Sequence, residues 1–236
     1  MSRETCYRCF RPARVCWCGE LVPMATRTRF VLLMHPKEFK REKANTGRIT
    51  HLCLANSEII VDASLEENVI LRERLADPTY HSALLYPGEA ACDLSAEQPL
   101  PAALTARPLQ LFILDATWSA ARKMLRLSPV LQALPRLMFR ATAPSRYRIK
   151  QQPQDGCLST LESVHELLLV LARRGLDHYA LPTQLLTAFA RMQDFQMECA
   201  ANPELGGYRR APYKETGARK ELVGQSARRR RYLRVD

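Results

Sequence analysis

Long apolar runs and glycine-rich nucleotide-binding loops are both missing from this chain of 236 residues. No apolar stretch approaches the ~20 residues that a membrane-spanning helix needs, so we expect no membrane segment and no membrane partner. The sequence contains neither Gly-x-Gly-x-x-Gly nor Gly-x4-Gly-Lys-Ser/Thr, which argues against a common dinucleotide-binding fold and against a P-loop. A signal peptide pattern is also absent, since cysteines begin at position 6. We therefore expect a cytoplasmic protein.

Acidic residues are few relative to basic ones. Asp and Glu number 24 against 35 Lys and Arg, which gives a formal net charge of +11. Such an excess indicates a polyanionic partner, most often nucleic acid. From residue 205 to the end there are ten basic and three acidic side chains, so the rest of the chain is only mildly basic. We interpret 203–236 as a basic tail that binds RNA; a solubilising tail without a partner is the alternative.

Half of the eight cysteines lie within the first eighteen residues, in the pattern Cys6-x2-Cys9-x6-Cys16-x-Cys18. Four thiolates at these spacings can bind one tetrahedral zinc, and so short a segment has no core of its own to hold it together. Four thiolates leave no open position on the metal, so the predicted zinc is structural. We predict a zinc-binding module over 1–27; four unrelated thiols are the alternative.

Strand and helix patterns alternate between residues 28 and 202. Short apolar runs predict buried strands at 30–34, 59–61, 83–86, 111–114 and 137–139. Apolar spacing predicts helices that end near 54, and over 65–75, 119–127, 158–174 and 183–199. Residues 89–108 are expected to be loop with one helical turn. The fold class is therefore α/β, with a mostly parallel sheet that helices cover on both faces.

The fourth apolar run stops abruptly at Asp115, before Thr117 and one of the two tryptophans, Trp118. In open α/β sheets the functional groups gather where strands end and helices begin. Asp115 is thus placed where a functional carboxylate is expected. The structural alternative is that Asp115 closes a turn and Thr117 caps the following helix.

Three further polar clusters fall in predicted loops. Each has a structural explanation, for instance a capping box at Ser159 and Glu162, an N-cap at Asn45, or a core histidine at His35. The clusters are His35-Pro36-Lys37-Glu38 with Asn45-Thr46-Gly47-Arg48, the segment Ser145-Arg146-Tyr147-Arg148-Ile149-Lys150, and Leu158-Ser159-Thr160-Leu161-Glu162.

Taken in order with the cysteine pattern and Asp-Ala-Thr-Trp at 115–118, these clusters resemble the DTW-domain family, the tRNA-uridine aminocarboxypropyltransferases. The resemblance covers the chain from Cys6 to about Gln196, and Lys150 stands where arginine is more often expected. It implies a fold like that of the SPOUT methyltransferases, whose C-terminal half is knotted around S-adenosylmethionine. It also implies the reaction, which transfers the 3-amino-3-carboxypropyl group of S-adenosylmethionine to N3 of a tRNA uridine and releases methylthioadenosine. Bacterial members similar to this chain act on the variable loop.

The resemblance also implies roles for individual residues. Asp115, Thr117 and Trp118 are the expected catalytic residues, with Asp115 either accepting the N3 proton or holding the base edge. The cofactor-binding residues are expected to be His35, Glu38, Asn45, Thr46, Gly47, Arg48, Leu158, Ser159, Thr160 and Glu162. The RNA-binding residues are expected to be Arg146, Tyr147, Arg148 and Lys150, with Arg228, Arg229, Arg230 and Arg231 of the tail.

Within the cofactor set the division of labour stays open. Arg48 or the N–H groups at Ser159 would bind the donor carboxylate, and Glu38 or Glu162 the amino group. The cofactors expected are S-adenosylmethionine and one structural zinc per chain. An S-adenosylmethionine-dependent RNA methyltransferase and a non-catalytic zinc-containing RNA-binding protein are the alternative functions. The chain is expected to act as a monomer or a homodimer.

Overall fold

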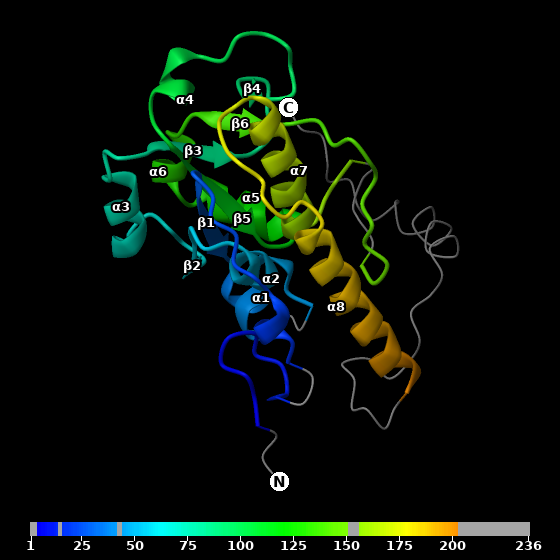
Figure 1. The fold of residues 1–236 in the computed structure, drawn as a ribbon. Coiled ribbons are helices and arrows are strands. Elements are labelled where there is room, and N and C mark those ends of the chain that lie inside the picture. Colours follow the sequence, from blue (N-terminus) through cyan, green and yellow to red (C-terminus); the bar gives the residue numbers. More distant parts are fainter. Residues whose placement is uncertain (1–3, 14–15, 42–43, 151–155, 203–236) are drawn as a thin grey trace, which may run out of the picture.

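The computed structural model describes residues 4–13, 16–41, 44–150 and 156–202, without the side chain of Arg41 (Figure 1). The predicted tail over 203–236, with its RNA-binding arginines 228–231, lies outside these residues. Six strands form one sheet in the order β2-β1-β5-β3-β6-β4, and every pairing is parallel. They are β1 (Arg29–Met34), β2 (Ser57–Val61), β3 (His81–Leu85), β4 (Cys92–Asp93), β5 (Leu109–Asp115) and β6 (Arg136–Met138).

Helices cover both faces of the sheet, as the alternating pattern predicts (Figure 1). On one face Phe30 and Leu32 pack with α2 (Thr46–Cys53), α7 (Thr160–Arg173) and α8 (Gln184–Ala201). On the other face Val31 and Leu33 pack with α3 (Val69–Leu75), α5 (Trp118–Arg126) and α6 (Pro129–Gln132). Burying each such side chain contributes about 1.5–3 kcal/mol, which explains why the strands are apolar throughout and not alternating.

Strand β5 lies in the middle of the sheet, between β1 and β3. Its apolar residues are buried up to Leu114, which is partly exposed, and the strand ends at Asp115. Asp115 is in register with Met34, the last residue of β1. Two parallel strands therefore end at the same edge, and the loops that follow them converge there.

Three local elements differ from the sequence expectation. The charged stretch after His35 forms α1 (Pro36–Arg41), because proline fits the first turn of a helix and Glu38 favours its N-terminal end. The region 89–108 contains the short strand β4 in addition to loop and one short helix, α4 (Ala102–Ala106), which matches the predicted helical turn. The helix expected over 65–75 begins only at Val69, where the Asn68 side chain accepts the N–H of Leu71 as an N-cap.

The N-terminal cysteine segment includes the 3-10 turn η2 (Cys18–Glu20) and packs below α1 and α2 in Figure 1. Trp17 and Met24 reach into the main core, so this segment is fixed to the sheet domain by apolar contacts. No helix in the described part of the chain is long and apolar enough to cross a membrane.

Candidate active site

Asp115 is buried at the C-terminal edge of the sheet, with 5% of its surface exposed. Its backbone carbonyl accepts the N–H of His35, which joins the ends of β5 and β1. The Thr160 hydroxyl donates to carboxylate Oδ1 at 2.6 Å. Oδ2 is buried and makes no hydrogen bond with a described residue. Buried polar atoms are normally hydrogen-bonded, so Oδ2 marks a position where a ligand atom can bind.

Gly47 allows α2 to approach this carboxylate. A Cβ at Gly47 would lie 2.3 Å from Asp115 Oδ2, closer than any side chain tolerates. Asn45 caps the same helix, since its side chain accepts the Arg48 N–H at 2.7 Å. Asp115 therefore lies against the first turn of α2 and the first turn of α7, where helix dipoles favour negative charge.

Burial raises the pKa of the Asp115 carboxyl above its ordinary value. The Thr160 hydroxyl opposes this shift, as do Lys150, Arg48 and Asn45, which favour the charged form. A carboxyl with a raised pKa accepts a proton more readily at neutral pH than an exposed aspartate does. The position therefore suits a general base.

Arg48 is the buried cation of the site, with 6% of its surface exposed. One guanidinium nitrogen donates to the Phe39 carbonyl at 3.0 Å. The guanidinium also lies over the rings of Phe10, at 4.3 Å, and Phe39, at 4.9 Å. Its Nε is buried without a hydrogen-bond partner among the described residues. Asp115 and Arg48 interact through their charges, and each has one buried polar atom without a described hydrogen-bond partner.

His35 and two lysines form a basic rim beside Asp115. The Nδ1 of His35 accepts the Lys37 N–H at 3.1 Å. Burial lowers the pKa of His35, and the nearby charges of Lys37 and Lys123 lower it further. A neutral histidine and two cations thus flank the strand ends.

Thr117 and Trp118 lie at the start of α5, and within the described part of the chain neither forms a hydrogen bond with the Asp115 carboxylate. The Thr117 hydroxyl accepts the Ala120 N–H at 3.4 Å, so its predicted capping role is confirmed. Trp118 is half-buried and belongs to neither of the two main apolar cores, which leaves part of its ring accessible. Catalytic roles for both residues stay predictions.

Glu162 is fully occupied by protein groups. Its carboxylate accepts the N–H and hydroxyl of Ser159, at 2.9 and 2.7 Å, which confirms the predicted capping box. It also accepts the Ser145 hydroxyl at 2.9 Å and the Arg146 N–H at 2.5 Å. Glu162 therefore ties the segment 145–150 to the start of α7. Glu38 lies half-buried on α1, and Leu158 half-buried just before the Ser159 cap.

The segment predicted to bind RNA is only partly turned toward solvent. The Tyr147 ring packs edge-on against Phe189 at 5.0 Å, and its hydroxyl donates to the Ala44 carbonyl. Arg148 forms an ion pair with Asp194 at 2.6 Å. Arg146 is exposed, and the Lys150 ammonium lies over the Tyr147 ring at 5.9 Å. Arg146 and Lys150 are thus better placed for a phosphate than Tyr147 is for a base.

The four N-terminal cysteines come together as the spacing predicts. The sulfur atoms of Cys6, Cys9, Cys16 and Cys18 all lie within 4.8 Å of one another, and none is in a disulfide. The Cys9 and Cys16 sulfurs are 3.8 Å apart, close to the ~3.7 Å that two 2.3 Å zinc–sulfur bonds at a tetrahedral angle require. The backbone N–H of Cys9 lowers the pKa of the Cys6 thiol to about 6. The donor set fits zinc.

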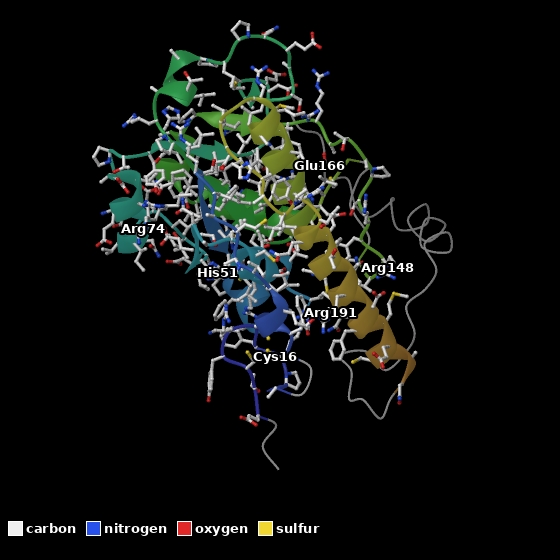
Figure 2. The ribbon with its side chains drawn as sticks, viewed as in Figure 1. Cys16, His51, Arg74, Arg148, Glu166 and Arg191 are labelled. Atoms are coloured by element: carbon white, nitrogen blue, oxygen red, sulfur yellow. The ribbon has the colours of Figure 1, made fainter. Side chains whose placement is uncertain are left out.

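The module is fastened to the sheet domain by further contacts besides those of Trp17 and Met24. Cys9 and Cys18 pack on Leu52 of α2. Arg191 of α8 pairs with Glu20 and also lies over the Trp17 ring at 5.3 Å. Figure 2 shows Cys16 at the end of the molecule that carries the N-terminus, below His51. Sequence reasoning missed Phe10, whose contact with Arg48 joins the module to the site.

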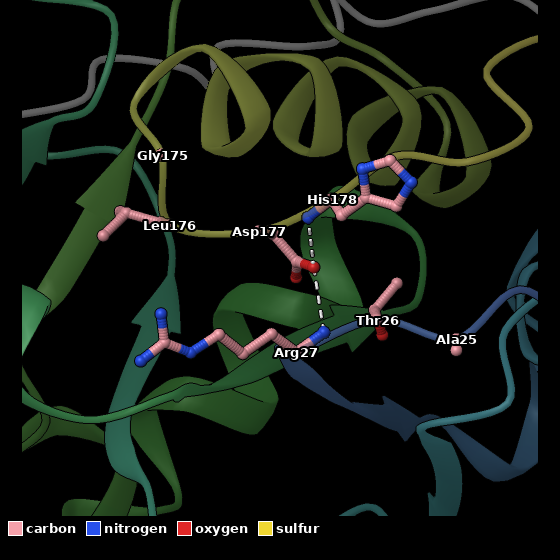
Figure 3. A pocket seen from close by; sticks show the side chains of 7 residues that line it. All are labelled: Ala25, Thr26, Arg27, Gly175, Leu176, Asp177 and His178. Atoms are coloured by element: carbon pink, nitrogen blue, oxygen red, sulfur yellow. Dashed lines mark hydrogen bonds between the residues drawn. The ribbon is translucent and has the colours of Figure 1, made fainter.

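One hollow lies away from Asp115, near the beginning of β1. It has a volume of about 510 Å³ and is lined by residues 25–27 and 175–178 (Figure 3). There the Asp177 carboxylate accepts the N–H groups of Arg27 and Thr28, both at 2.8 Å. This carboxylate joins the α7–α8 connection to β1, a structural task. A second hollow of about 450 Å³ lies beside the cysteine module and includes Arg48.

Sequence comparisons identify relatives over most of the chain. The DTW domain profile matches residues 3–197. The tRNA-uridine aminocarboxypropyltransferase 2 of Drosophila melanogaster is 33% identical over 178 residues, which are 73% of this chain and 68% of that protein. The protein of the same name in Mus musculus is 29% identical over 79% of this chain and 63% of its own length. The Arabidopsis thaliana tRNA-uridine aminocarboxypropyltransferase A is 24% identical over 82% and 81%. The chain thus spans about two thirds of its animal relatives, and no solved structure matches it.

Proposed function

The chain belongs to the DTW-domain family, and from this premise we propose that it is a tRNA-uridine aminocarboxypropyltransferase. It would transfer the 3-amino-3-carboxypropyl group of S-adenosylmethionine to N3 of a tRNA uridine, in the variable loop, and release methylthioadenosine. The observation that carries the proposal is the buried Asp115 carboxylate, whose Oδ2 has no partner among described residues, at the edge where β1 and β5 end.

We assign Asp115 as the general base that accepts the proton of uridine N3. That proton is weakly acidic, and its removal makes N3 a better nucleophile. Oδ2 is the acceptor atom, because Oδ1 already accepts the Thr160 hydroxyl. Lys150 and Arg48 stabilise the carboxylate before the transfer, and burial stabilises the acid after it.

The residues around Asp115 fit the amino acid end of the donor. We assign the donor carboxylate to Arg48, whose Nε has no described partner, and to the N–H groups at the start of α7. Glu38 is assigned to the ammonium, because four hydrogen bonds already occupy Glu162. When bound, the donor supplies an alkyl carbon activated by the adjacent sulfonium, and methylthioadenosine leaves with the electron pair of the carbon–sulfur bond.

Several finer assignments accompany this function. We propose one structural zinc in the 1–27 module, a catalytic domain over 28–202 with the knotted arrangement of SPOUT proteins, and an RNA-binding tail over 203–236. The remaining predicted cofactor residues, His35, Asn45, Thr46, Gly47, Leu158, Ser159 and Thr160, lie on the loops and helix starts at the Asp115 edge. Because the substrate is tRNA, we propose a cytoplasmic location.

The proposal is tested by mass analysis of tRNA nucleosides after incubation with the protein and S-adenosylmethionine. We expect a uridine that gains an aminocarboxypropyl group, together with released methylthioadenosine. A gain of one methyl group would instead identify an RNA methyltransferase. Unmodified nucleosides despite tRNA binding would leave a non-catalytic zinc-containing RNA-binding protein.

A further inference from the structure

The second hollow, which we call the knuckle groove, lies between the cysteine module and the sheet domain. Its polar and aromatic lining comes from Tyr7, Arg8, Phe10, Phe39, Arg48 and His51. No carboxylate is among the described residues that line it. Its volume of about 450 Å³ falls in the ~300–1,000 Å³ range of pockets that hold small molecules. The groove is therefore cationic, aromatic and large enough for a nucleoside.

Two aromatic side chains of the module stay exposed beside this groove. Tyr7 is 90% exposed and Phe10 is 50% exposed, although large apolar rings are normally buried in a folded protein. Both lie in the loop that is closed by the β-bridge between Thr5 and Pro12. Tyr7 lies between Cys6 and Cys9, and Phe10 directly follows Cys9. Their exposure is thus built into the zinc-binding loop and does not follow from a missing core.

The backbone at Phe10 is held in the left-handed region, with φ at 57°. A bulky residue with positive φ is strained, and such strain persists where the surrounding structure fixes it, often at functional sites. Here the strain places the ring against Phe39, with centroids 5.6 Å apart, and under the Arg48 guanidinium. The groove wall is therefore preformed.

Arg48 connects the groove to the reaction site. It lines the groove, and its charge also favours the ionised form of Asp115. Arg8 contributes a second guanidinium, which is exposed and makes no ion pair with a described residue. Because Arg48 is buried, the exposed Arg8 is the guanidinium of this groove that complements a phosphate, and the exposed rings complement a base.

We propose that the knuckle groove binds an unstacked nucleotide of the tRNA substrate, adjacent to the uridine that is modified. Tyr7 stacks on the base, and Arg8 pairs with its phosphate. The zinc module thereby has a function in substrate binding beyond holding its own fold. This inference rests on the proposed function, because tRNA is the assumed substrate.

The test compares zinc-loaded full-length variants for binding of an unmodified tRNA transcript by fluorescence anisotropy at several salt concentrations. Tyr7→Ala should weaken binding about tenfold, whereas Tyr7→Phe should stay close to the unaltered protein, because stacking needs only the ring. Arg8→Ala should weaken binding and reduce the salt slope by about one. Zinc content and thermal midpoint are measured for each variant, to separate binding from folding.

Arg173→Ala is the matched control for charge. Arg173 is exposed at the last turn of α7, far from the start of that helix at Asp115, and its side chain makes no hydrogen bond or ion pair with a described residue. It removes the same charge as Arg8→Ala, and its tRNA affinity should exceed that of Arg8→Ala.

Unchanged tRNA affinity in Tyr7→Ala and Arg8→Ala, in a protein that still modifies tRNA, would overturn the groove assignment alone. Weaker binding of S-adenosylmethionine with unchanged tRNA affinity would also overturn it, since the occupant would be the donor. A protein that binds tRNA through Tyr7 without transferring any group would retain the groove and refute the proposed reaction. Absence of tRNA binding in the unaltered protein would refute both.

Discussion

At the scale of single residues, the two oxygens of Asp115 have different tasks. Oδ1 accepts the Thr160 hydroxyl, which fixes the orientation of the carboxylate, while Oδ2 has no partner among described residues. Gly47 lets the first turn of α2 lie directly against the buried Oδ2, since a Cβ there would be 2.3 Å from this oxygen. A carboxylate that is fixed by one oxygen and free at the other is suited to take a proton from a bound base.

Gly47→Ala should therefore damage the site more than the fold. The new methyl group would displace the Asp115 carboxylate, and overpacking of this kind costs about 1–3 kcal/mol. We expect a lower thermal midpoint and a large loss of transfer. Gly19→Ala is the control, because a Cβ at Gly19 meets no atom within 4 Å. Equal activity in the two variants would contradict the close approach described for Gly47.

Asp115→Asn should lower kcat/KM about 10²–10⁴-fold, the usual contribution of a general base. tRNA affinity should remain near that of the unaltered protein, because the side chain keeps its shape. Activity of the unaltered enzyme should fall as the pH decreases, with an apparent pKa above that of an ordinary aspartate, since burial raises the pKa of Asp115. Full transfer by the Asn variant would exclude the carboxylate from the chemistry.

The same pKa shift predicts how stability depends on pH. A folded-state pKa above the unfolded value, about 3.9, means that the folded protein holds its proton more tightly. The contribution of Asp115 is thus fully favourable below the unfolded pKa and is lost as the pH rises through the folded pKa. Relative to the unaltered protein, Asp115→Asn should become more stable as the pH rises from about 4. The trend is measured as the urea midpoints of both proteins as the pH rises from about 4. Midpoints that change with pH in the same way in both proteins would contradict it.

At the scale of elements, the start of α7 does two things at once. Thr160 donates to Asp115, while the neighbouring capping box uses Glu162 to hold the 145–150 segment. That segment carries Lys150, one of the two cations that favour the ionised form of Asp115. The helix cap therefore also holds the segment that carries Lys150, and we propose that Glu162 acts as a positioning residue.

The cysteine module is the second element whose task extends beyond itself. Cys16→Ser should lose the zinc, which should be present at about one equivalent in the unaltered protein. Because Phe10 contacts Arg48, loss of the metal should also lower transfer activity. Cys92→Ser in β4 is the control, since Cys92 lies outside the cluster of four sulfurs. Zinc content and transfer activity are measured for both variants. A metal-free but active protein would contradict the zinc assignment.

At the scale of the whole molecule, positive charge is divided between the described domain and the tail. The basic rim at His35, Lys37 and Lys123 and the segment with Arg146 and Lys150 lie near the reaction site. Residues 205–236 add a surplus of seven positive charges to a chain whose total is +11. We therefore propose that the tail contributes to tRNA affinity and not to the chemistry of transfer.

Deleting 205–236 should weaken tRNA binding and flatten its dependence on salt, because fewer counterions are released. Replacing Arg228, Arg229, Arg230 and Arg231 by glutamine should reproduce part of this effect, with the salt slope reduced by roughly 3. Transfer at saturating tRNA should persist in both variants. Binding with an unaltered salt slope would reduce the tail to a solubilising segment.

Sequence reasoning predicted the architecture because a strand that is buried on both faces needs an unbroken apolar run. The run 111–114 is of this kind and therefore indicates a buried strand. It likewise predicted the cysteine cluster, because the spacing of four cysteines within eighteen residues is typical of ligands to one metal ion. The caps at Asn45, Thr117 and Ser159 are also local, and the structure has all three.

Only the tertiary structure decided which polar residues meet. The orphan Oδ2 of Asp115, its contact with Gly47 and the separation of Glu162 from the proposed proton transfer depend on how α2 and α7 pack at one edge of the sheet. The same holds for Phe10 and Arg48, which are distant in sequence and join the cysteine module to the site. Sequence alone determines which segments form strands, helices and metal ligands, because these follow from local spacing. The free oxygen and the knuckle groove arise from side chains of several elements, and their positions are fixed only when the helices pack against the sheet.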